Sequence, residues 1–309
     1  MPDLRRDPVT GDLVLFSPRR AARPHTIAAP PPAPSAATCP FDPGHEDATP
    51  PEVFRTGTGA PGEPGWRVRV TPNLYPIVDG PDAGKDAGGA HEVVVLSPDH
   101  DRSFGMLDDA EAVEVLAVMR DRARRHIDAG CAFVQVFINH GRAGGASIAH
   151  PHAQVVALEF VPPVVEALAA RFDAANDDPL DVDRAIDPKL VVRDGPAPTW
   201  CPWASAAPYT VRIEPPDPRT TFDQAADDSI RAVAFSARDA LASVRVVLDD
   251  PAYNLVVHTA PPTGSRRPYW FAEIRPRTSV IAGFELATNV LVNTVIPEVA
   301  SEQLRAGLP

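Results

Sequence analysis

The sequence predicts an α+β protein built from two similar halves, each an antiparallel sheet with one long helix. Two observations indicate this fold. Each half carries one amphipathic segment flanked by apolar strands, and the two sets of segments repeat at a nearly constant offset. Strands joined through a single helix are typical of an α+β unit. We therefore expect an internal duplication.

The two predicted helices begin with acidic residues 119 residues apart. The first begins at Asp108-Asp109, where an aspartate can cap the first turn, and ends at Gly130. The second begins at Asp227-Asp228. Both carry apolar residues at helical spacing, so each is expected to lay one face against a sheet.

Apolar strands flank both helices and repeat with them. Residues 134–139 correspond to residues 253–258 at an offset of 119, and residues 91–98 correspond to residues 209–216 at an offset of 118. One insertion or deletion accounts for the difference. Each half is therefore expected to contain two strands, the helix and two further strands.

A segment dense in aspartate and proline, residues 175–198, separates the two sets of elements. Such composition is typical of a surface connection. We predict a first domain of residues 1–174, a linker of residues 175–198 and a second domain of residues 199–309. The two domains are expected to face each other.

The charge balance restricts the classes of partner. The 309 residues include 29 Lys and Arg against 41 Asp and Glu, a formal net charge of −12 that disfavours broad contact with nucleic acid or an anionic membrane. No stretch approaches the roughly 18 apolar residues of a membrane span, and residues 1–7 lack the apolar region of a signal peptide. With only three cysteines as well, a cytoplasmic protein is expected.

The most informative segment is a strand, a glycine-rich loop and a second strand within residues 139–158. The glycines let backbone N–H groups approach an anion closely, as in phosphate-binding loops. In the second strand, alternation places His150, His152 and Gln154 on the same face. A neutral imidazole can attack phosphorus without a separate base, because its ordinary pKa is about 6.5. This arrangement indicates phosphoryl or nucleotidyl transfer through a covalent histidine.

The histidine pair is confined to the first half. The repeat aligns His150 with Tyr269 and His152 with Phe271. His258 in the second half has no such partner and is predicted to be a scaffold residue or a distal substrate contact. A single site per chain is therefore expected.

The motif His150-Pro-His-x-Gln154 resembles the signature of the galactose-1-phosphate uridylyltransferases, a family of the histidine-triad superfamily. The resemblance extends along nearly the whole chain and includes residues 4–11, 17–24, 39–44, 66–76, 283–286 and 293–298. It implies two histidine-triad-like halves. Because members of this family are often dimers, it also implies a homodimer.

The resemblance implies a double-displacement transferase. His152 would take UMP from UDP-glucose, and galactose 1-phosphate would then collect it. Gln154 stands where the histidine-triad hydrolases have a third histidine. A carboxamide donates a hydrogen bond to a phosphoryl oxygen but is a poor proton donor to a leaving group, which favours transfer over hydrolysis. Ser147 matches the family's loop and would help to orient the nucleophile.

Further substrate contacts are implied by the same resemblance. Asn139 and Gly145 match the phosphate-binding loop, and Asn73 matches a position near the base. Three more positions match residues that approach the nucleotide or the sugar hydroxyls, and they are Arg20, Arg23 and Glu285.

Two alternatives remain open. A nucleotide-sugar phosphorylase acting on ADP- or UDP-glucose would use inorganic phosphate as the acceptor of the same histidine intermediate. A catalytically inactive nucleotide-sugar binding protein is the alternative of another class, which the presence of both His152 and Gln154 disfavours.

A structural zinc ion is also implied by the resemblance. Many members bind zinc through Cys-x-x-Cys, a later histidine and the first histidine of the motif. The corresponding residues here are Cys39, Asp42, His100 and His150, a ligand set compatible with one zinc ion per chain. Aspartate replaces the second cysteine, and His45 is a rival ligand. In the alternative interpretation, Cys39 is an ordinary loop thiol.

Overall fold

The computed structural model describes residues 3–22, 39–78, 80 and 88–309, and its centre is one sheet of ten strands. All neighbouring strands in this sheet are antiparallel. In spatial order they are β3 (Phe54–Gly57), β4 (Trp66–Pro72), β5 (Gly89–Val95), β7 (His152–Leu158), β6 (Phe133–His140), β11 (Tyr253–Thr259), β12 (Trp270–Pro276), β10 (Val211–Ile213), β9 (Thr199–Trp200) and β8 (Val191–Arg193). The predicted α+β class is thereby confirmed.

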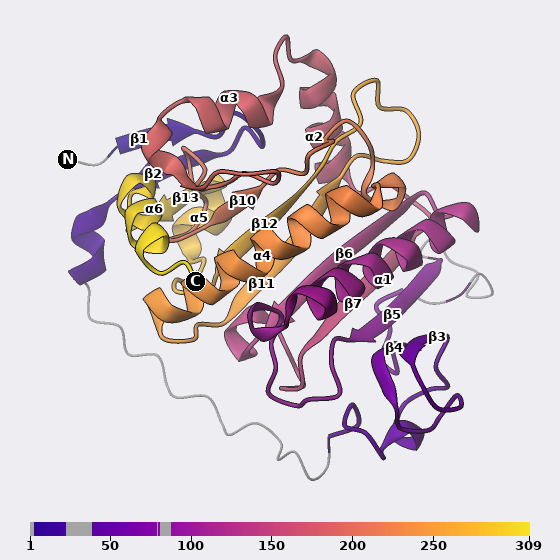
Figure 1. The fold of residues 1–309 in the computed structure, drawn as a ribbon. Coiled ribbons are helices and arrows are strands. Elements are labelled where there is room, and N and C mark those ends of the chain that lie inside the picture. The colour runs from indigo at the N-terminus through magenta and orange to yellow at the C-terminus, as the bar shows by residue number, and fades with distance from the viewer. Residues whose placement is uncertain (1–2, 23–38, 79, 81–87) are drawn as a thin grey trace.

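The two predicted helices are present as α1 (Asp109–Asp128) and α4 (Asp227–Leu248), and they lie side by side on one face of the sheet (Figure 1). A capping box begins α1. The Asp108 carboxylate accepts from the Glu111 N–H at 2.9 Å, and the Glu111 carboxylate accepts from the Asp108 N–H at 2.8 Å. This pairing satisfies two backbone donors that a helix start leaves free.

Strand alternation divides the sheet into a helix-covered face and an open face. On β6, Val134, Val136 and Ile138 join the main core with α1, as Leu255 and Val257 of β11 do with α4. The residues between them point the other way. The polar side chains that lie between these apolar positions therefore emerge on the face without the long helices.

The two halves meet at β6 and β11. In this pair Phe137 lies opposite Val256, its own counterpart at an offset of 119 residues. Counterparts placed opposite each other in an antiparallel pair relate the halves by a local two-fold axis. The prediction that the halves face each other is therefore wrong, because they lie side by side in one continuous sheet.

Residues 175–198 are more structured than the linker that we predicted. They contain α3 (Pro179–Ala185), the short helix η7 (Pro188–Leu190) and β8, which forms an edge of the large sheet. Each helix begins at an Asp-Pro pair, in which the aspartate caps the first turn and proline supplies a preformed φ angle. The Asp-Pro pairs of residues 175–198 therefore begin helices and do not mark an unstructured connection.

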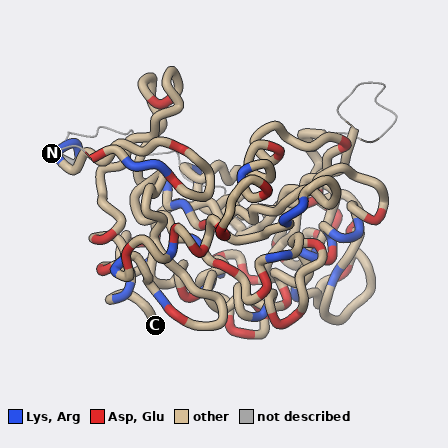
Figure 2. Tube along the Cα trace, turned by 90° about the horizontal axis from the view of Figure 1, so that it is seen from above, with Lys and Arg blue, Asp and Glu red and all other residues tan. Residues whose placement is uncertain are grey.

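A second, three-stranded sheet closes one end of the molecule. It consists of β1 (Asp3–Arg6), β2 (Leu13–Phe16) and β13 (Val290–Asn293), which pairs with β2 in parallel. The remaining α-helices of the described residues are α2 (Pro163–Ala174), α5 (Gly283–Thr288) and α6 (Pro297–Ala306). Among the described residues, no helix combines the length and apolar character needed to cross a bilayer. Acidic and basic residues are interspersed along the described chain (Figure 2).

Candidate active site

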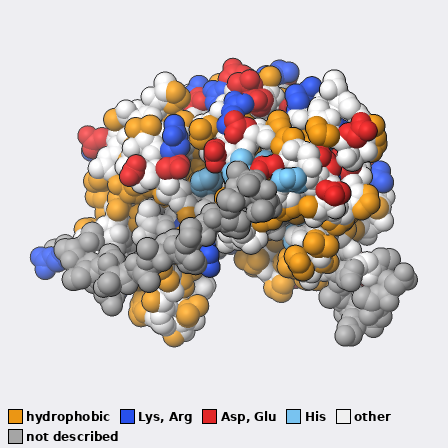
Figure 3. All heavy atoms as spheres, turned by 90° about the horizontal axis from the view of Figure 1, so that it is seen from below, with side chains coloured by type: hydrophobic (Ala, Val, Ile, Leu, Met, Phe, Trp, Pro, Cys, Tyr) orange, Lys and Arg blue, Asp and Glu red, His pale blue; other side chains and the backbone are white. Residues whose placement is uncertain are grey.

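The open face of the first half contains a cavity of about 430 Å³ next to His152, the first residue of β7. Histidine side chains are visible near the middle of the face seen in Figure 3, with hydrophobic side chains on the lobes to either side. The cavity is lined by residues from β4, β5, β6, β7 and three loops. Five predicted substrate or catalytic residues line it together with His152, and they are Asn73, Asn139, Gly145, Ser147 and Gln154.

The hydrogen bond of His152 determines which of its nitrogens can react. Its Nδ1 lies 3.0 Å from the His150 carbonyl oxygen, which only accepts, so Nδ1 carries the proton. The lone pair is therefore on Nε2. The side chain is 5% exposed, and this burial lowers the pKa of His152 below its ordinary value. A neutral imidazole with a free Nε2 is the form that a nucleophile requires.

The loop between β6 and β7 places several hydrogen-bond donors beside this histidine. Gly141 and Gly145 have φ angles of 67° and 92°, in the left-handed region that favours glycine. Ser147 is exposed to the cavity. Asn139 and Gln154 bring two carboxamides to the same space. Such groups can donate hydrogen bonds to the oxygens of a phosphate.

His91 is a residue of this site that the sequence reasoning missed. It is 6% exposed on β5, and its Nε2 lies 2.9 Å from Gln154 Oε1. The Asn73 amide nitrogen also lies 3.2 Å from the same ring nitrogen. Burial lowers the pKa of His91. The strand that carries it was predicted, but only the pairing of β5 with β7 brings this side chain beside the motif.

The four predicted metal ligands form one cluster. The candidate ligand atoms of Cys39, Asp42, His100 and His150 all lie within 4.8 Å of one another. Ligands at about 2.0–2.3 Å from a tetrahedral zinc ion are about 3.3–3.8 Å apart, so the cluster needs little adjustment to hold the ion. His45 is not among these residues, because its Nδ1 contacts the Cys39 carbonyl at 2.7 Å.

The hydrogen bonds of His150 support a cation at this cluster. Its Nε2 lies 2.8 Å from the Ser97 carbonyl oxygen and its Nδ1 lies 2.7 Å from Asp42 Oδ1. A neutral ring has only one N–H, so it cannot donate to two acceptors. His100 Nδ1 also contacts Asp42 Oδ1, at 2.9 Å. Burial alone would raise the pKa of Asp42, but these two histidines outweigh it and hold that pKa below its usual value.

Two predicted substrate residues lie away from the cavity. Arg20 is exposed in the short helix η1 (Pro18–Ala22), next to β2. Glu285 lies in α5, where its carboxylate accepts from the Ala282 N–H at 3.1 Å. Neither lines the cavity of His152 in this chain. Arg23 lies outside the described residues.

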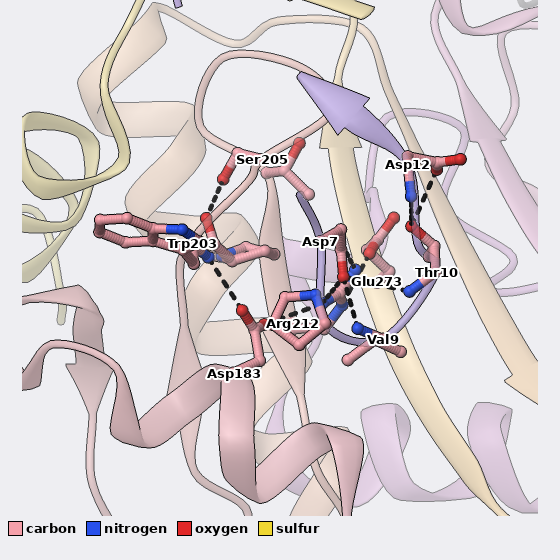
Figure 4. A network of polar contacts seen from close by, with 12 residues as sticks. Asp7, Val9, Thr10, Asp12, Asp183, Trp203, Ser205, Arg212 and Glu273 are labelled. Carbon is pink, nitrogen blue, oxygen red and sulfur yellow. Dashed lines mark hydrogen bonds and ion pairs between the residues drawn. The ribbon is translucent and has the colours of Figure 1, made fainter. Parts of the chain in front are cut away.

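On the equivalent face of the second half, the described residues form a buried ionic cluster around Arg212. Arg212, 1% exposed, contacts Asp7 at 2.7 Å, Asp183 at 2.8 Å and Glu273 at 3.0 Å (Figure 4). The ring of His258 stacks on Phe271 with centroids 4.6 Å apart. These contacts support the scaffold interpretation of His258.

Comparisons with known proteins give a consistent picture. Residues 83–162 match the family model "Galactose-1-phosphate uridyl transferase, N-terminal domain". An ADP-glucose phosphorylase of Arabidopsis thaliana is 32% identical over 98% of this chain and 92% of that protein. A galactose-1-phosphate uridylyltransferase of Haemophilus influenzae is 25% identical over 99% of this chain and 94% of that protein. The solved structure of an Arabidopsis thaliana ADP-glucose phosphorylase with bound ADP-glucose has a TM-score of 0.87 at 30% identity, covering 99% of this chain and 98% of that one.

Proposed function

Because the chain belongs to the galactose-1-phosphate uridylyltransferase family, we propose that it transfers a nucleotidyl group from a nucleotide sugar to a phosphate acceptor through a covalent intermediate on His152. The observation that carries this proposal is the hydrogen bond from His152 Nδ1 to the His150 carbonyl, which leaves Nε2 as the free nucleophilic atom beside the cavity. The relatives named above are enzymes that act on nucleotide sugars, which supports the same reaction class.

In the first step, the Nε2 lone pair of His152 attacks the α-phosphorus of the nucleotide sugar. An N–P bond forms, and the bond from that phosphorus to the bridging oxygen breaks. The electron pair leaves with the sugar 1-phosphate, which needs no proton because it is a stable anion. Donors from Gln154 and Asn139 would face the charge that develops on the phosphoryl oxygens, where such donors are worth about 10²–10³ in rate.

In the second step, an oxygen of the acceptor attacks the same phosphorus and the N–P bond breaks, so that His152 regains its lone pair. We propose that inorganic phosphate is the acceptor and ADP-glucose the donor, which gives ADP and glucose 1-phosphate. The likeness to an ADP-glucose phosphorylase along nearly the entire chain supports this choice.

Transfer of UMP from UDP-glucose to galactose 1-phosphate is the second candidate. It uses the same first step and differs only in the base and in the acceptor. The likeness to galactose-1-phosphate uridylyltransferases, at lower identity, supports it. The two reactions are distinguished by the acceptor that discharges the intermediate.

We also propose that Cys39, Asp42, His100 and His150 hold one zinc ion. The His150 ring, whose two nitrogens both face oxygen acceptors, and the shared Asp42 oxygen support a cation there. When bound, zinc would supply structural stability rather than chemistry. The ion would link the loop of Cys39 to His150, whose carbonyl accepts the His152 N–H, and would thereby orient the nucleophile.

A homodimer would complete the site. Arg20 and Glu285 resemble substrate-contacting residues of the family, yet they lie outside the cavity of their own chain. The segment around Glu285 presents exposed apolar side chains that suit a protein contact, and these are Val280, Ile281, Phe284 and Leu286. We propose that this segment of one chain reaches the cavity of a second copy.

Isolation of the intermediate tests the function. The protein is mixed with ADP-glucose or with UDP-glucose, separated from small molecules and analysed by intact and peptide mass spectrometry. We expect a mass increase of one nucleotidyl group, labile to acid, on His152. Inorganic phosphate or galactose 1-phosphate is then added, and the faster discharge identifies the acceptor.

His152→Ala should abolish the adduct, whereas His126→Gln, at a histidine on α1 outside the cavity, should keep it. An adduct on another residue, or intersecting initial-rate plots typical of a ternary complex, would contradict the nucleophile. Rapid release of free nucleoside monophosphate without an acceptor would indicate a hydrolase. A wild-type protein that binds nucleotide sugars without any adduct would indicate an inactive binding protein.

A further inference from the structure

We infer that His91 and Asn254 are positioning residues, which bind the carboxamide oxygens of Gln154 and Asn139 and so leave the NH₂ groups to donate to a phosphate in the cavity. This inference rests on the proposed function, because it concerns how the two carboxamides meet a phosphoryl group. Each positioning residue contacts one carboxamide oxygen, and each is itself held by a backbone group whose hydrogen-bonding polarity is unambiguous.

A backbone N–H fixes the tautomer of His91. Ile77 N lies 3.2 Å from His91 Nδ1, and a backbone N–H can only donate, so Nδ1 holds the lone pair of the ring. In the neutral ring the proton is then on Nε2. Burial lowers the pKa of His91 and favours this neutral form. The Nε2–H of His91 donates to Gln154 at 2.9 Å, and only the amide oxygen of Gln154 can accept this hydrogen bond.

Asn73 also contacts the His91 ring. Its Oδ1 accepts from the Tyr75 N–H at 2.9 Å, which leaves its NH₂ group facing the ring. That NH₂ group lies 3.3 Å from Nδ1 and 3.2 Å from Nε2, so it does not distinguish the two ring nitrogens. The tautomer is therefore assigned by the Ile77 N–H, and Gln154 receives the single ring proton.

A backbone carbonyl fixes the orientation of the Asn254 carboxamide. Asn254 Nδ2 lies 2.7 Å from the Gly144 oxygen, which can only accept, so the atom there is the NH₂ group. The same nitrogen lies 2.8 Å from Asn139, which must present its oxygen. The Asn139 NH₂ group is then turned toward Gly145, because a Cβ added to that glycine would lie 3.5 Å from Asn139 Nδ2.

Asn254 comes from the second half of the chain. It lies directly opposite Asn139 in the pairing of β11 with β6. The half that has no histidine pair thus supplies one of the two residues that orient the site. This contact gives the continuous sheet a role in the chemistry beyond support of the fold.

The orientation matters because phosphoryl oxygens only accept hydrogen bonds. A carboxamide that turns its NH₂ group to the phosphate donates to the charge that develops in transfer, whereas the flipped amide presents an oxygen that repels it. A free carboxamide rotates between the two states. A donor that binds the carboxamide oxygen disfavours the flipped amide before substrate binds.

The test compares variants that keep or lose the required polarity. His91→Gln can still donate to Gln154 and accept from Ile77, whereas His91→Met can do neither. Asn254→Asp has the same shape as asparagine but offers Asn139 only acceptors. We measure the single-turnover rate of nucleotidyl transfer to His152, the dissociation constant of ADP, the melting temperature and the metal content.

We expect His91→Met and Asn254→Asp to slow transfer about 10–100-fold with a change of less than about five-fold in ADP binding. His91→Gln should retain the rate within about five-fold of wild type. Rates within two-fold of wild type for both His91→Met and Asn254→Asp would overturn the inference. Equal losses of transfer rate in His91→Gln and His91→Met would also overturn the inference, because a purely structural role of His91 predicts equal losses.

A second measurement uses the wild-type protein and needs no turnover. The ¹⁵N chemical shifts of labelled histidines report which ring nitrogen carries the proton. We expect His91, assigned by its absence in His91→Gln, to be the neutral tautomer protonated on Nε2. A tautomer protonated on Nδ1 overturns the inference even if the adduct forms. Conversely, if His91 shows the expected tautomer but no adduct forms on His152, the proposed function is rejected and the positioning role of His91 is not.

Discussion

Glu273 occupies in the second half the position that Gln154 occupies in the first. Gln154 pairs with Phe137 of β6, and Glu273 pairs with Val256 of β11, the counterpart of Phe137. The carboxamide borders a cavity, whereas the carboxylate is buried against Arg212 at 3.0 Å. One copy of the duplicated unit therefore has an open polar face, and the other has a buried ionic cluster at the matching position.

Removal of Arg212 should destabilise the fold severely. Arg212→Met would leave the carboxylates of Asp7, Asp183 and Glu273 buried without their shared cation. We expect a loss of about 3–5 kcal/mol in the free energy of unfolding, measured by urea denaturation. Arg231→Met is the control, because its pair with Asp228 is exposed and should contribute less than about 1 kcal/mol. Equal losses in both variants would contradict the role of the cluster.

Stability should fall as the pH drops below 6.5, in part because of His258. Burial lowers the pKa of His258 to about 4, although Glu273 opposes this shift. Between about pH 6.5 and pH 4 the unfolded chain therefore takes up a proton that the folded chain refuses, so stability is lost as pH falls through this window, by at most about 3 kcal/mol.

The variant His258→Asn isolates this contribution, because it introduces the residue found at the matching position of the first half. Its unfolding free energy, measured by urea denaturation from pH 8 to pH 4, should fall less steeply than that of wild type. Parallel curves for the two proteins would show that His258 titrates normally in the folded state.

Protein purified without chelators should contain about one equivalent of zinc per chain. Chelation should lower the melting temperature before it lowers the transfer rate measured at low temperature. Asp42→Asn should weaken metal retention, whereas Asp42→Cys, which creates the family's Cys-x-x-Cys pattern, should preserve it. Less than about 0.2 equivalents of any transition metal in the wild type would remove the support for this site.

Gly145→Ala should reduce transfer more than stability. The φ angle of 92° disfavours any side chain, and the added Cβ would contact the Asn139 amide at 3.5 Å. We expect a rate loss of about ten-fold with a destabilisation of about 1 kcal/mol. Gly264→Ala is a matched control, because its φ is also 92° and an added Cβ would have no neighbour within 4 Å. A similar rate loss in Gly264→Ala would show that backbone strain, and not the contact with Asn139, slows transfer.

Mixed chains should reveal a shared site. If Glu285 of one copy reaches the cavity of the other, His152→Ala and Glu285→Ala chains are each inactive alone. Co-expressed, they should recover about a quarter of the wild-type activity, because half of the dimers then contain one intact site. Heterodimers that form without recovering activity would place Glu285 outside the shared site.

Local order along the chain explains what could be predicted from the sequence. The capping aspartate and apolar spacing of α1, and the matching pattern of α4, were sufficient to locate both helices. The nearly constant offset indicated the duplication. Alternation put His152 and Gln154 on the same face of β7, and that face borders the cavity. The prediction was wrong for His150, because β7 begins only at His152 and His150 belongs to the cluster of candidate metal ligands.

Long-range pairing decided the rest. The sequence alone was sufficient to identify the candidate residues, because the histidine pair and the glycine-rich loop lie within twenty residues of chain. The three-dimensional fold was needed to show that β6 pairs with β11, and hence that Asn254 contacts Asn139 and that the halves lie side by side. His91 and Asp7 acquired their partners in the same way. Such contacts depend on which strands and loops pack together, a choice made by the free energy of the entire core rather than by any local pattern.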